Sequence, residues 1–244
     1  MRTLVLGLPL PHLTFDNYSF LSAPSLFDYG RIIVDMAAVS QAVEEVVSGE
    51  REHFTFARQP IVNGPGDHGS FSLAELLRLR RLEAERFFER GGDLVSLAYP
   101  DAVHAGVAGL PAWRRYDWLP APEGFSYAEG LLAGHGKLGV EVSDEGHAFA
   151  TFARRFGVRL AFRTYLAEAD GPPPFARVFA RSPGGAAVGF ELALGHGRAV
   201  FLPPLADLDY DKDRVPLASV LAECLDRLQE QPDQPVQWKS KEAS

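Results

Sequence analysis

The sequence predicts an α/β protein with a mostly parallel sheet and an antiparallel hairpin extension near its C-terminus. Two features of the chain lead to this fold class. In the N-terminal part, short apolar runs alternate with stretches of helical periodicity, an order typical of parallel strands joined by right-handed helical crossovers. After residue 175, three strand-like runs follow one another across short glycine-containing turns, which is typical of antiparallel hairpins.

Three short apolar runs in the N-terminal part are predicted to be buried strands: residues 3–8, 31–35 and 93–99. Two helices are expected between the second and the third run. The first carries valines at helical spacing and ends at Gly49. The second begins with a capping box, in which the Ser72 hydroxyl and the Glu75 carboxylate satisfy free backbone N–H groups, and it ends at Gly91.

Residues 100–136 interrupt this order with several prolines and glycines. Five aromatic residues also lie in the segment: Trp113, Tyr116, Trp118, Phe125 and Tyr127. Because disordered loops are usually poor in aromatic residues, an ordered excursion over the end of the sheet is expected. The alternative is a poorly ordered loop.

The C-terminal part adds two helices and the hairpins. Asp144 is expected to cap a helix that stops at Gly157, and residues 158–166 alternate like a strand with one exposed face. A last helix is expected to enter through Pro216 and to carry Cys224 on its apolar stripe. The hairpin strands are predicted at residues 177–181, 186–194 and 198–202.

The hydrophobic fraction of 46% is ordinary for a globular protein, and no linker or repeat divides the chain. We therefore expect one α/β domain over residues 1–228 and a polar, disordered tail over residues 229–244. No stretch approaches the roughly 20 apolar residues of a membrane helix. Prolines at positions 9 and 11 shorten the only apolar run near the N-terminus, so no signal peptide is expected.

The formal charge of −8 repels phosphate backbones, which disfavours direct binding to nucleic acid. A single cysteine excludes an intramolecular disulfide and a cysteine-based zinc site. It also fits a reducing compartment, so a cytoplasmic protein is expected. The composition leaves open whether the chain forms a homo-oligomer and which small molecule or protein is its partner.

Several catalytic and cofactor motifs are missing. The sequence contains neither a G-x-S-x-G elbow nor a phosphate-binding loop after its first strand. Residues 207–213 resemble the start of a calcium loop but lack its sixth-position glycine, and a loop that ends in a helix N-cap explains them more simply. The histidines show no paired helical spacing. We therefore expect no cofactor and no metal.

Polar residues at strand ends remain as site candidates. Ligands of an open parallel sheet bind outside the carboxyl ends of its strands, and polar side chains follow the first three predicted strands. The catalytic candidates are Asp35, Asp101 and His104. The ligand-binding candidates are Asp16, Asn17, Tyr18 and Tyr99. The alternative interpretation is that Asp35 caps the following helix and that the others lie in solvated loops.

Two stretches resemble a known family. Residues 86–100, RFFERGGDLVSLAYP, resemble the helix–strand unit of class I glutamine amidotransferase-like domains, including the trehalose-utilisation-like branch. Residues 187–204, AVGFELALGHGRAVFLPP, are similar to the late hairpin of these domains. With the first two strands, the resemblance covers most of residues 1–228 and implies a three-layer, flavodoxin-like or amidotransferase-like sheet. Motifs at the level of the fold imply no activity.

The chain departs from this family at the catalytic residues. Amidotransferases of this class depend on a cysteine in a tight elbow and on a late His–Glu pair, whereas this chain has no cysteine near residue 100 and no such pair. Glutaminase activity is therefore disfavoured, and the resemblance implies a degenerate member of the family.

We accordingly expect a non-catalytic amidotransferase-like module that binds a small ligand or a partner protein, with residues 100–136 as part of the binding surface. One alternative is a hydrolase-type enzyme that uses carboxylates and a histidine at the carboxyl edge of the sheet. Another is an accessory subunit of a larger complex.

Overall fold

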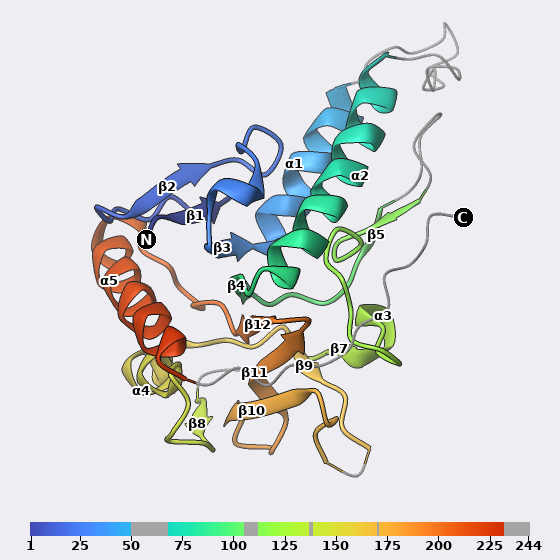
Figure 1. The fold of residues 1–244 in the computed structure, drawn as a ribbon. Helices are drawn as coiled ribbons and strands as arrows, with labels where there is room; N and C mark the ends of the chain where they lie inside the picture. The colour runs from blue at the N-terminus through green and yellow to red at the C-terminus, as the bar shows by residue number, and fades with distance from the viewer. Residues whose placement is uncertain (50–67, 105–111, 137–138, 170, 232–244) are drawn as a thin grey trace, which may run out of the picture.

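A computed structural model describes residues 1–49, 68–104, 112–136, 139–169 and 171–231 (Figure 1). Within these ranges a ten-stranded sheet forms the centre of the molecule, and its main path runs β2-β1-β3-β4-β12-β11-β10-β8. The strands on one side of this path are β2 (Phe15–Tyr18), β1 (Thr3–Leu6), β3 (Arg31–Asp35), β4 (Asp93–Leu97) and β12 (Gly197–Leu202). The others are β11 (Ala187–Leu194), β10 (Ala176–Arg181) and β8 (Glu141–Val142), with β7 (Leu131–Ala133) and β9 (Thr164–Leu166) branching off.

Parallel and antiparallel pairing meet at β12. The neighbours from β2 to β12 are all parallel, and β12 pairs with β4 through Leu202 opposite Leu97. From β12 onward, the pairs β12–β11, β11–β10 and β10–β8 are antiparallel. The prediction of an α/β fold with a parallel part and a C-terminal antiparallel extension is therefore confirmed.

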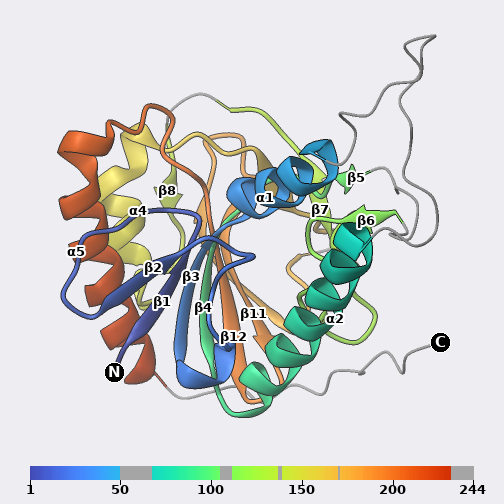
Figure 2. The same cartoon turned by 90° about the horizontal axis from the view of Figure 1, so that it is seen from above.

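Helices cover both faces of the sheet (Figure 2). The helices α1 (Met36–Gly49) and α2 (His68–Glu89) lie on one face, and α4 (Ala150–Phe156) and α5 (Tyr210–Gln229) lie on the other. Successive strand side chains point to opposite faces. Ile32 and Val34 of β3 therefore belong to the core under α1 and α2, whereas Ile33 belongs to the core under α4 and α5.

Buried arginines fix the C-terminal end of α5 to the amino edge of the sheet. Arg198 of β12 pairs with Asp93 of β4 at 3.1 Å and donates a hydrogen bond to the Leu228 carbonyl at 2.8 Å. Arg31 of β3 donates to Asp226 at 2.6 Å. Because the last carbonyls of a helix lack intrahelical partners, a guanidinium group placed there can satisfy them. Of the predicted disordered tail, residues 232–244 lie outside the described residues, and residue 229 is still helical.

The structure corrects the prediction that Asp16, Asn17 and Tyr18 lie in a loop past the first strand. They belong to β2, which runs parallel to β1 at the edge of the sheet, with Phe15 opposite Thr3. The connection between β1 and β2, residues 7–14, contains no helix and is shorter than a usual parallel crossover. The hydrophobic pattern therefore gives no sign that a second parallel strand follows.

Three predicted helix starts are also wrong. Because α2 begins at His68, Ser72 lies inside the helix, and Glu75 pairs with Arg78 instead of closing a capping box. Asp144 lies six residues before α4 and accepts a hydrogen bond from the Gly146 N–H at 2.9 Å. The last helix begins at Tyr210, so Pro216 lies within it.

The predicted strand over residues 158–166 is shorter than expected. Its first residues form the 3-10 turn η2 (Gly157–Arg159), and only Thr164–Leu166 pair as β9. The side chain of Arg159 turns away to form an ion pair with Asp213 at 2.6 Å. Within the described residues, no helix combines the length and the apolar character needed to cross a membrane.

Candidate functional site

Asp35, at the carboxyl end of β3, is a helix cap. Its Oδ1 accepts a hydrogen bond from the Ala37 N–H at 2.9 Å, at the start of α1. Burial raises the pKa of the Asp35 carboxyl above its ordinary value, and the hydrogen bonds from the helix N-terminus offset only part of this rise. The interpretation of Asp35 as a cap is therefore correct, and its carboxylate already has backbone partners.

The strand order reverses between β1 and β3, and here the loop after β1 lies close to α1. Gly7 follows β1 with a φ of +76°, and a Cβ built there would lie 2.3 Å from the Cβ of Ala38 in α1. The loop after β1 thus packs directly against the first turn of α1. A side chain at position 7 would therefore collide with α1.

Of the three candidates in β2, only Tyr18 lies at the carboxyl end of the strands, opposite Leu6 of β1. Asp16 pairs with Arg2, which precedes β1, and accepts a hydrogen bond at 3.1 Å from Tyr29, which precedes β3. It therefore lies toward the amino edge of the sheet. Asn17 holds the loop before β2 through two hydrogen bonds to the Leu10 backbone, at 2.8 and 3.0 Å. The partly exposed Tyr18 ends the edge strand.

Tyr99 and Arg115 mark the carboxyl end of β4. The guanidinium carbon of Arg115 lies 5.7 Å from the centre of the Tyr99 ring, and its Nε donates to Ser40 of α1 at 2.7 Å. Beside them is an open pocket of about 630 Å³, which is also lined by His135 and Arg163. The Arg163 guanidinium and the His135 ring nitrogen are 3.3 Å apart. This edge is basic on its exposed side.

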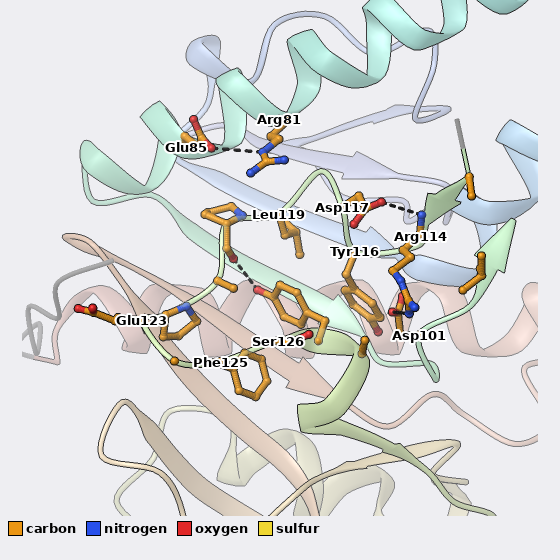
Figure 3. Close-up of a pocket in the computed structure, with 18 residues that line it drawn as sticks. Arg81, Glu85, Asp101, Arg114, Tyr116, Asp117, Leu119, Glu123, Phe125 and Ser126 are labelled. Atoms are coloured by element: carbon orange, nitrogen blue, oxygen red, sulfur yellow. Dashed lines mark hydrogen bonds and ion pairs between the residues drawn. The ribbon is translucent and has the colours of Figure 1, made fainter. Parts of the chain in front are cut away.

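A larger pocket lies between α2 and residues 112–128 of the excursion, with a volume of about 910 Å³ (Figure 3). Arg81 and Glu85 of α2 form one wall and pair with each other at 3.4 Å. The other lining residues come from the excursion and from its root at Asp101. We call this space the excursion pocket.

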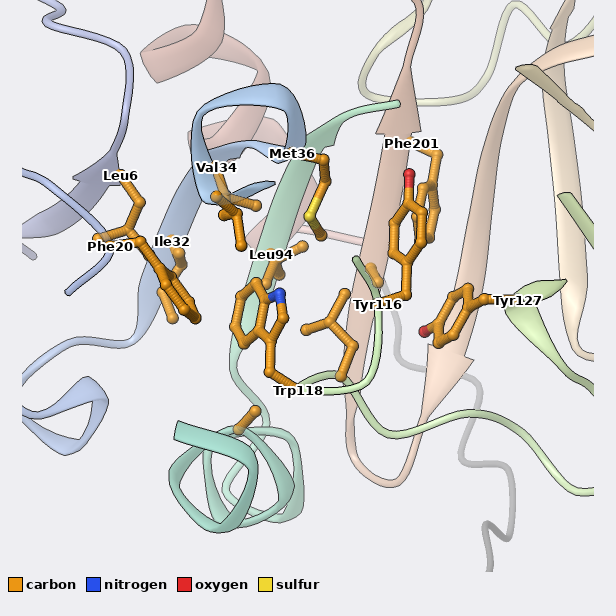
Figure 4. Packing of buried hydrophobic residues seen from close by; sticks show 14 of the residues in the cluster. Leu6, Phe20, Ile32, Val34, Met36, Leu94, Tyr116, Trp118, Tyr127 and Phe201 are labelled. Atoms are coloured by element: carbon orange, nitrogen blue, oxygen red, sulfur yellow. The ribbon is translucent and has the colours of Figure 1, made fainter. Parts of the chain in front are cut away.

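Aromatic packing holds the excursion against the sheet, where the ring centres of Tyr116 and Phe201 of β12 are 6.2 Å apart (Figure 4). Trp118 packs against Phe20 with ring centres 5.1 Å apart, and Tyr116 stacks on Tyr127 at 5.0 Å. The Tyr116 hydroxyl donates to the Tyr99 carbonyl at 2.7 Å and accepts from its N–H at 3.2 Å. The prediction of an ordered, aromatic excursion is confirmed for its described residues.

Asp101 lies at one end of the excursion pocket, beside Arg114 and Tyr116 (Figure 3). Its side chain is only 4% exposed. Its Oδ2 accepts a hydrogen bond from Arg114 Nη1 at 2.9 Å, but its Oδ1 is buried and has no hydrogen-bond partner among the residues that the structure describes. Buried polar atoms are hydrogen-bonded in the great majority of cases, so this carboxylate oxygen is exceptional.

The charged residues of the excursion pocket are mostly acidic. Four carboxylates line it, those of Glu85, Asp101, Asp117 and Glu123, against the guanidinium groups of Arg81 and Arg114. The phenols of Tyr116 and Tyr127 stay neutral, because burial raises the pKa of both. Arg114 and Asp117 are not among the residues that the sequence patterns predicted for a site. In Trp113-Arg114-Arg115-Tyr116-Asp117-Trp118, the aromatic side chains are buried and Arg114 and Asp117 are exposed, a pattern that could have indicated a surface built on an aromatic base.

Among the side chains that the structure describes, neither a histidine nor the cysteine lines this pocket. The backbone of His104 lies in β5 (Val103–His104), which pairs with β6 (Trp113–Arg114); the position of its side chain falls outside the described part of the structure. His147 and Glu191 meet at 3.2 Å, but the His147 side chain is completely buried against Phe179. Cys224 lies in the core under α5, as predicted. No group of three or more potential metal ligands occurs within the described ranges.

No protein-family model matches the chain, and no curated protein matches it either. Solved structures that resemble it include the crystal structure of β-galactosidase from Bacillus circulans sp. alkalophilus, with 13% sequence identity and a TM-score of 0.40. The alignment covers 89% of this chain and 25% of the β-galactosidase chain. At this level of likeness, no activity, substrate or site is carried over from that enzyme.

Proposed function

We propose that the chain is a non-catalytic ligand-binding module and that it holds a small organic molecule in the excursion pocket. The observation that carries this proposal is a buried Asp101 Oδ1, unpartnered among the described residues, in the wall of a pocket of about 910 Å³, a volume in the range of small-molecule sites. Leaving such an atom unpaired costs about 1–3 kcal/mol, which a ligand that donates a hydrogen bond would recover.

We also propose that the fold is a degenerate amidotransferase-like one. The five parallel strands lie in the order β2-β1-β3-β4-β12. Counted among themselves along the chain, this is the order 2-1-3-4-5 of flavodoxin-like sheets, which supports the proposal. The segment after β4 begins with Ala98, Tyr99 and Pro100, whereas the chain's cysteine lies in α5. Glutaminase chemistry therefore has no nucleophile at this strand end.

A hydrolase that uses the strand-end carboxylates is less well supported. General acid and base groups must both reach one substrate. Asp35 is occupied as a helix cap, and Asp16 pairs with residues near the amino edge of the sheet. These two carboxylates cannot serve as an acid–base pair at the carboxyl edge in this arrangement.

The proposal is tested by filling the pocket. Ser126 lines it, is exposed and makes no side-chain capping hydrogen bond, so Ser126→Trp places an indole at the opening at little structural cost. The probes are a fragment panel of amines, carboxylic acids, sugars and nucleosides, with binding measured by saturation-transfer NMR. We expect fragments that bind the wild-type chain and lose binding in Ser126→Trp.

The matched control is Leu132→Trp, which adds the same ring at an exposed position of β7 outside the lining of the pocket. Fragments should bind this variant as they bind the wild type. If no fragment distinguishes Ser126→Trp from Leu132→Trp, the excursion pocket is not a ligand site.

A further inference from the structure

We propose that the excursion pocket takes a small organic ammonium ion, whose charged group pairs with Asp101 in the place that Arg114 now holds. This inference rests on the proposed function, because it names the chemical class of ligand for the same pocket. It is carried by the burial of Asp101, by the exposure of Arg114 and by the excess of carboxylates in the pocket lining.

Asp101 needs a cation. An ionised carboxylate that is 4% exposed is costly unless it is paired and hydrogen-bonded. Arg114 supplies one hydrogen bond to Oδ2, and Oδ1 receives none from the described residues. A primary ammonium group carries three donors on one nitrogen and could serve both oxygens.

Arg114 can be displaced without unfolding its loop. Its side chain is 45% exposed, and one Nη1 contact of 2.9 Å joins it to Asp101. Its backbone is held separately, because its N–H donates to Asp117 Oδ2 at 2.8 Å. Because the Arg114 side chain is 45% exposed, its guanidinium can be hydrated when a ligand cation takes its place on the Asp101 carboxylate. When the guanidinium swings toward solvent, it frees the Oδ2 atom that it now binds.

The surroundings favour an organic cation. The lining holds more carboxylates than arginines, Arg81 is already paired with Glu85, and the chain as a whole carries a charge of −8. A field of this sign concentrates cations and repels carboxylates and phosphates. Phe125, Pro120 and Pro122 provide apolar surface for the carbon skeleton of the ligand.

The probes for the test are benzylammonium, benzoate and benzyl alcohol, which share one ring and differ in the charge of the polar group. Each is titrated into the full chain at neutral pH, and dissociation constants are taken from amide chemical-shift changes. We expect benzylammonium to bind most tightly and benzoate most weakly.

Two variants should act in opposite directions. Asp101→Asn removes the negative charge and should weaken benzylammonium binding by about tenfold or more. Arg114→Gln removes the competing cation and should tighten it by up to about fivefold. Glu129→Gln is the control, since it makes the same carboxylate-to-amide change in the short helix α3 (Tyr127–Gly130), outside the pocket lining, and should leave the affinity unchanged.

The possible failures point to different conclusions. If benzoate binds most tightly and Arg114→Gln weakens it, the pocket is an anion site; the ammonium assignment is then wrong while the proposed function stands. Equal affinities of Asp101→Asn and Glu129→Gln for benzylammonium would also overturn the assignment.

If none of the three probes binds at millimolar concentration but other fragments are excluded by Ser126→Trp, only the ligand class is wrong. If no fragment of any class is excluded, the proposed function fails as well.

Discussion

Asp35 and Asp101 show how two residues of the same type, after neighbouring strands, come to differ. Both come at or after the end of an apolar strand, and both were identifiable from the sequence as strand-end carboxylates. Asp35 leads at once into α1, so backbone N–H groups satisfy it. Asp101 leads into the irregular excursion, which brings it one arginine and leaves Oδ1 unpaired. Sequence position could select these residues, but only the structure of the next segment separates a helix cap from a candidate ligand-binding carboxylate.

Cys224 gives a prediction at the same scale. Burial raises the pKa of its thiol to about 12, and reactions of cysteine proceed through the thiolate. We expect no reaction with a thiol-specific disulfide reagent at about pH 8 in the native protein, and one equivalent in denaturant. The measurement is the absorbance of the coloured thiolate that the reagent releases when it reacts with Cys224, followed over time. Rapid native labelling would show that the core under α5 opens readily.

The element whose start was least predictable is α5. Its proline suggested entry at Pro216, but the acidic string before it forms the true N-terminus. Asp209 accepts hydrogen bonds from the N–H groups of Asp211 and Lys212, and Asp213 accepts one from the N–H of Asp209 at 2.8 Å. This is a reciprocal cap with aspartate in the role of glutamate. The calcium-like string does contain a helix N-cap, but this is Asp209, and residues 210–213 already belong to the helix.

The pKa of Asp213 yields a prediction of pH dependence. Its hydrogen bonds from Arg159 lower the pKa from 3.8 to about 2. A carboxyl whose pKa is lower in the folded state than in the unfolded state stabilises the protein when the pH is above the unfolded-state pKa. This stabilisation is lost as the pH falls toward the folded-state pKa. Asp213→Asn should therefore lower the free energy of unfolding at pH 7, and the difference from the wild type should shrink between about pH 4 and pH 2.

Urea unfolding at a series of pH values measures this effect. Asp211→Asn is the matched control, because it removes a carboxylate from the same helical turn but has no ion pair with Arg159 among the described contacts. It should show a smaller loss at neutral pH. A loss for Asp213→Asn that is independent of pH would mean that its ion pair with Arg159 does not stabilise the folded state.

At the scale of the whole molecule, local patterns predicted most elements but not all of their partners. The strands β1, β3, β4 and β10–β12 carry periodicities and turns that mark them. β2 could not be placed, because a polar four-residue edge strand buries little apolar surface. The pairing of β12 with β4, which joins the two halves of the sheet, connects residues far apart in the chain and leaves no local signature.

The excursion pocket could not be predicted either, because it also depends on contacts between residues far apart in the chain. The aromatic residues of the excursion predicted order, and burial of Tyr116, Trp118 and Tyr127 explains it. The wall that α2 contributes, and the position of Arg114 over Asp101, depend on tertiary contacts that no spacing rule contains. The aspartate was therefore predictable as a candidate, whereas the cavity beside it was not.

The most direct test of the ligand site is a crystal structure of the chain soaked with benzylammonium. We expect its nitrogen within about 3 Å of the Asp101 carboxylate oxygens, its ring against Phe125, and the Arg114 guanidinium turned toward solvent. A probe bound elsewhere, or an excursion pocket that stays empty with Arg114 still paired to Asp101, would contradict the assignment.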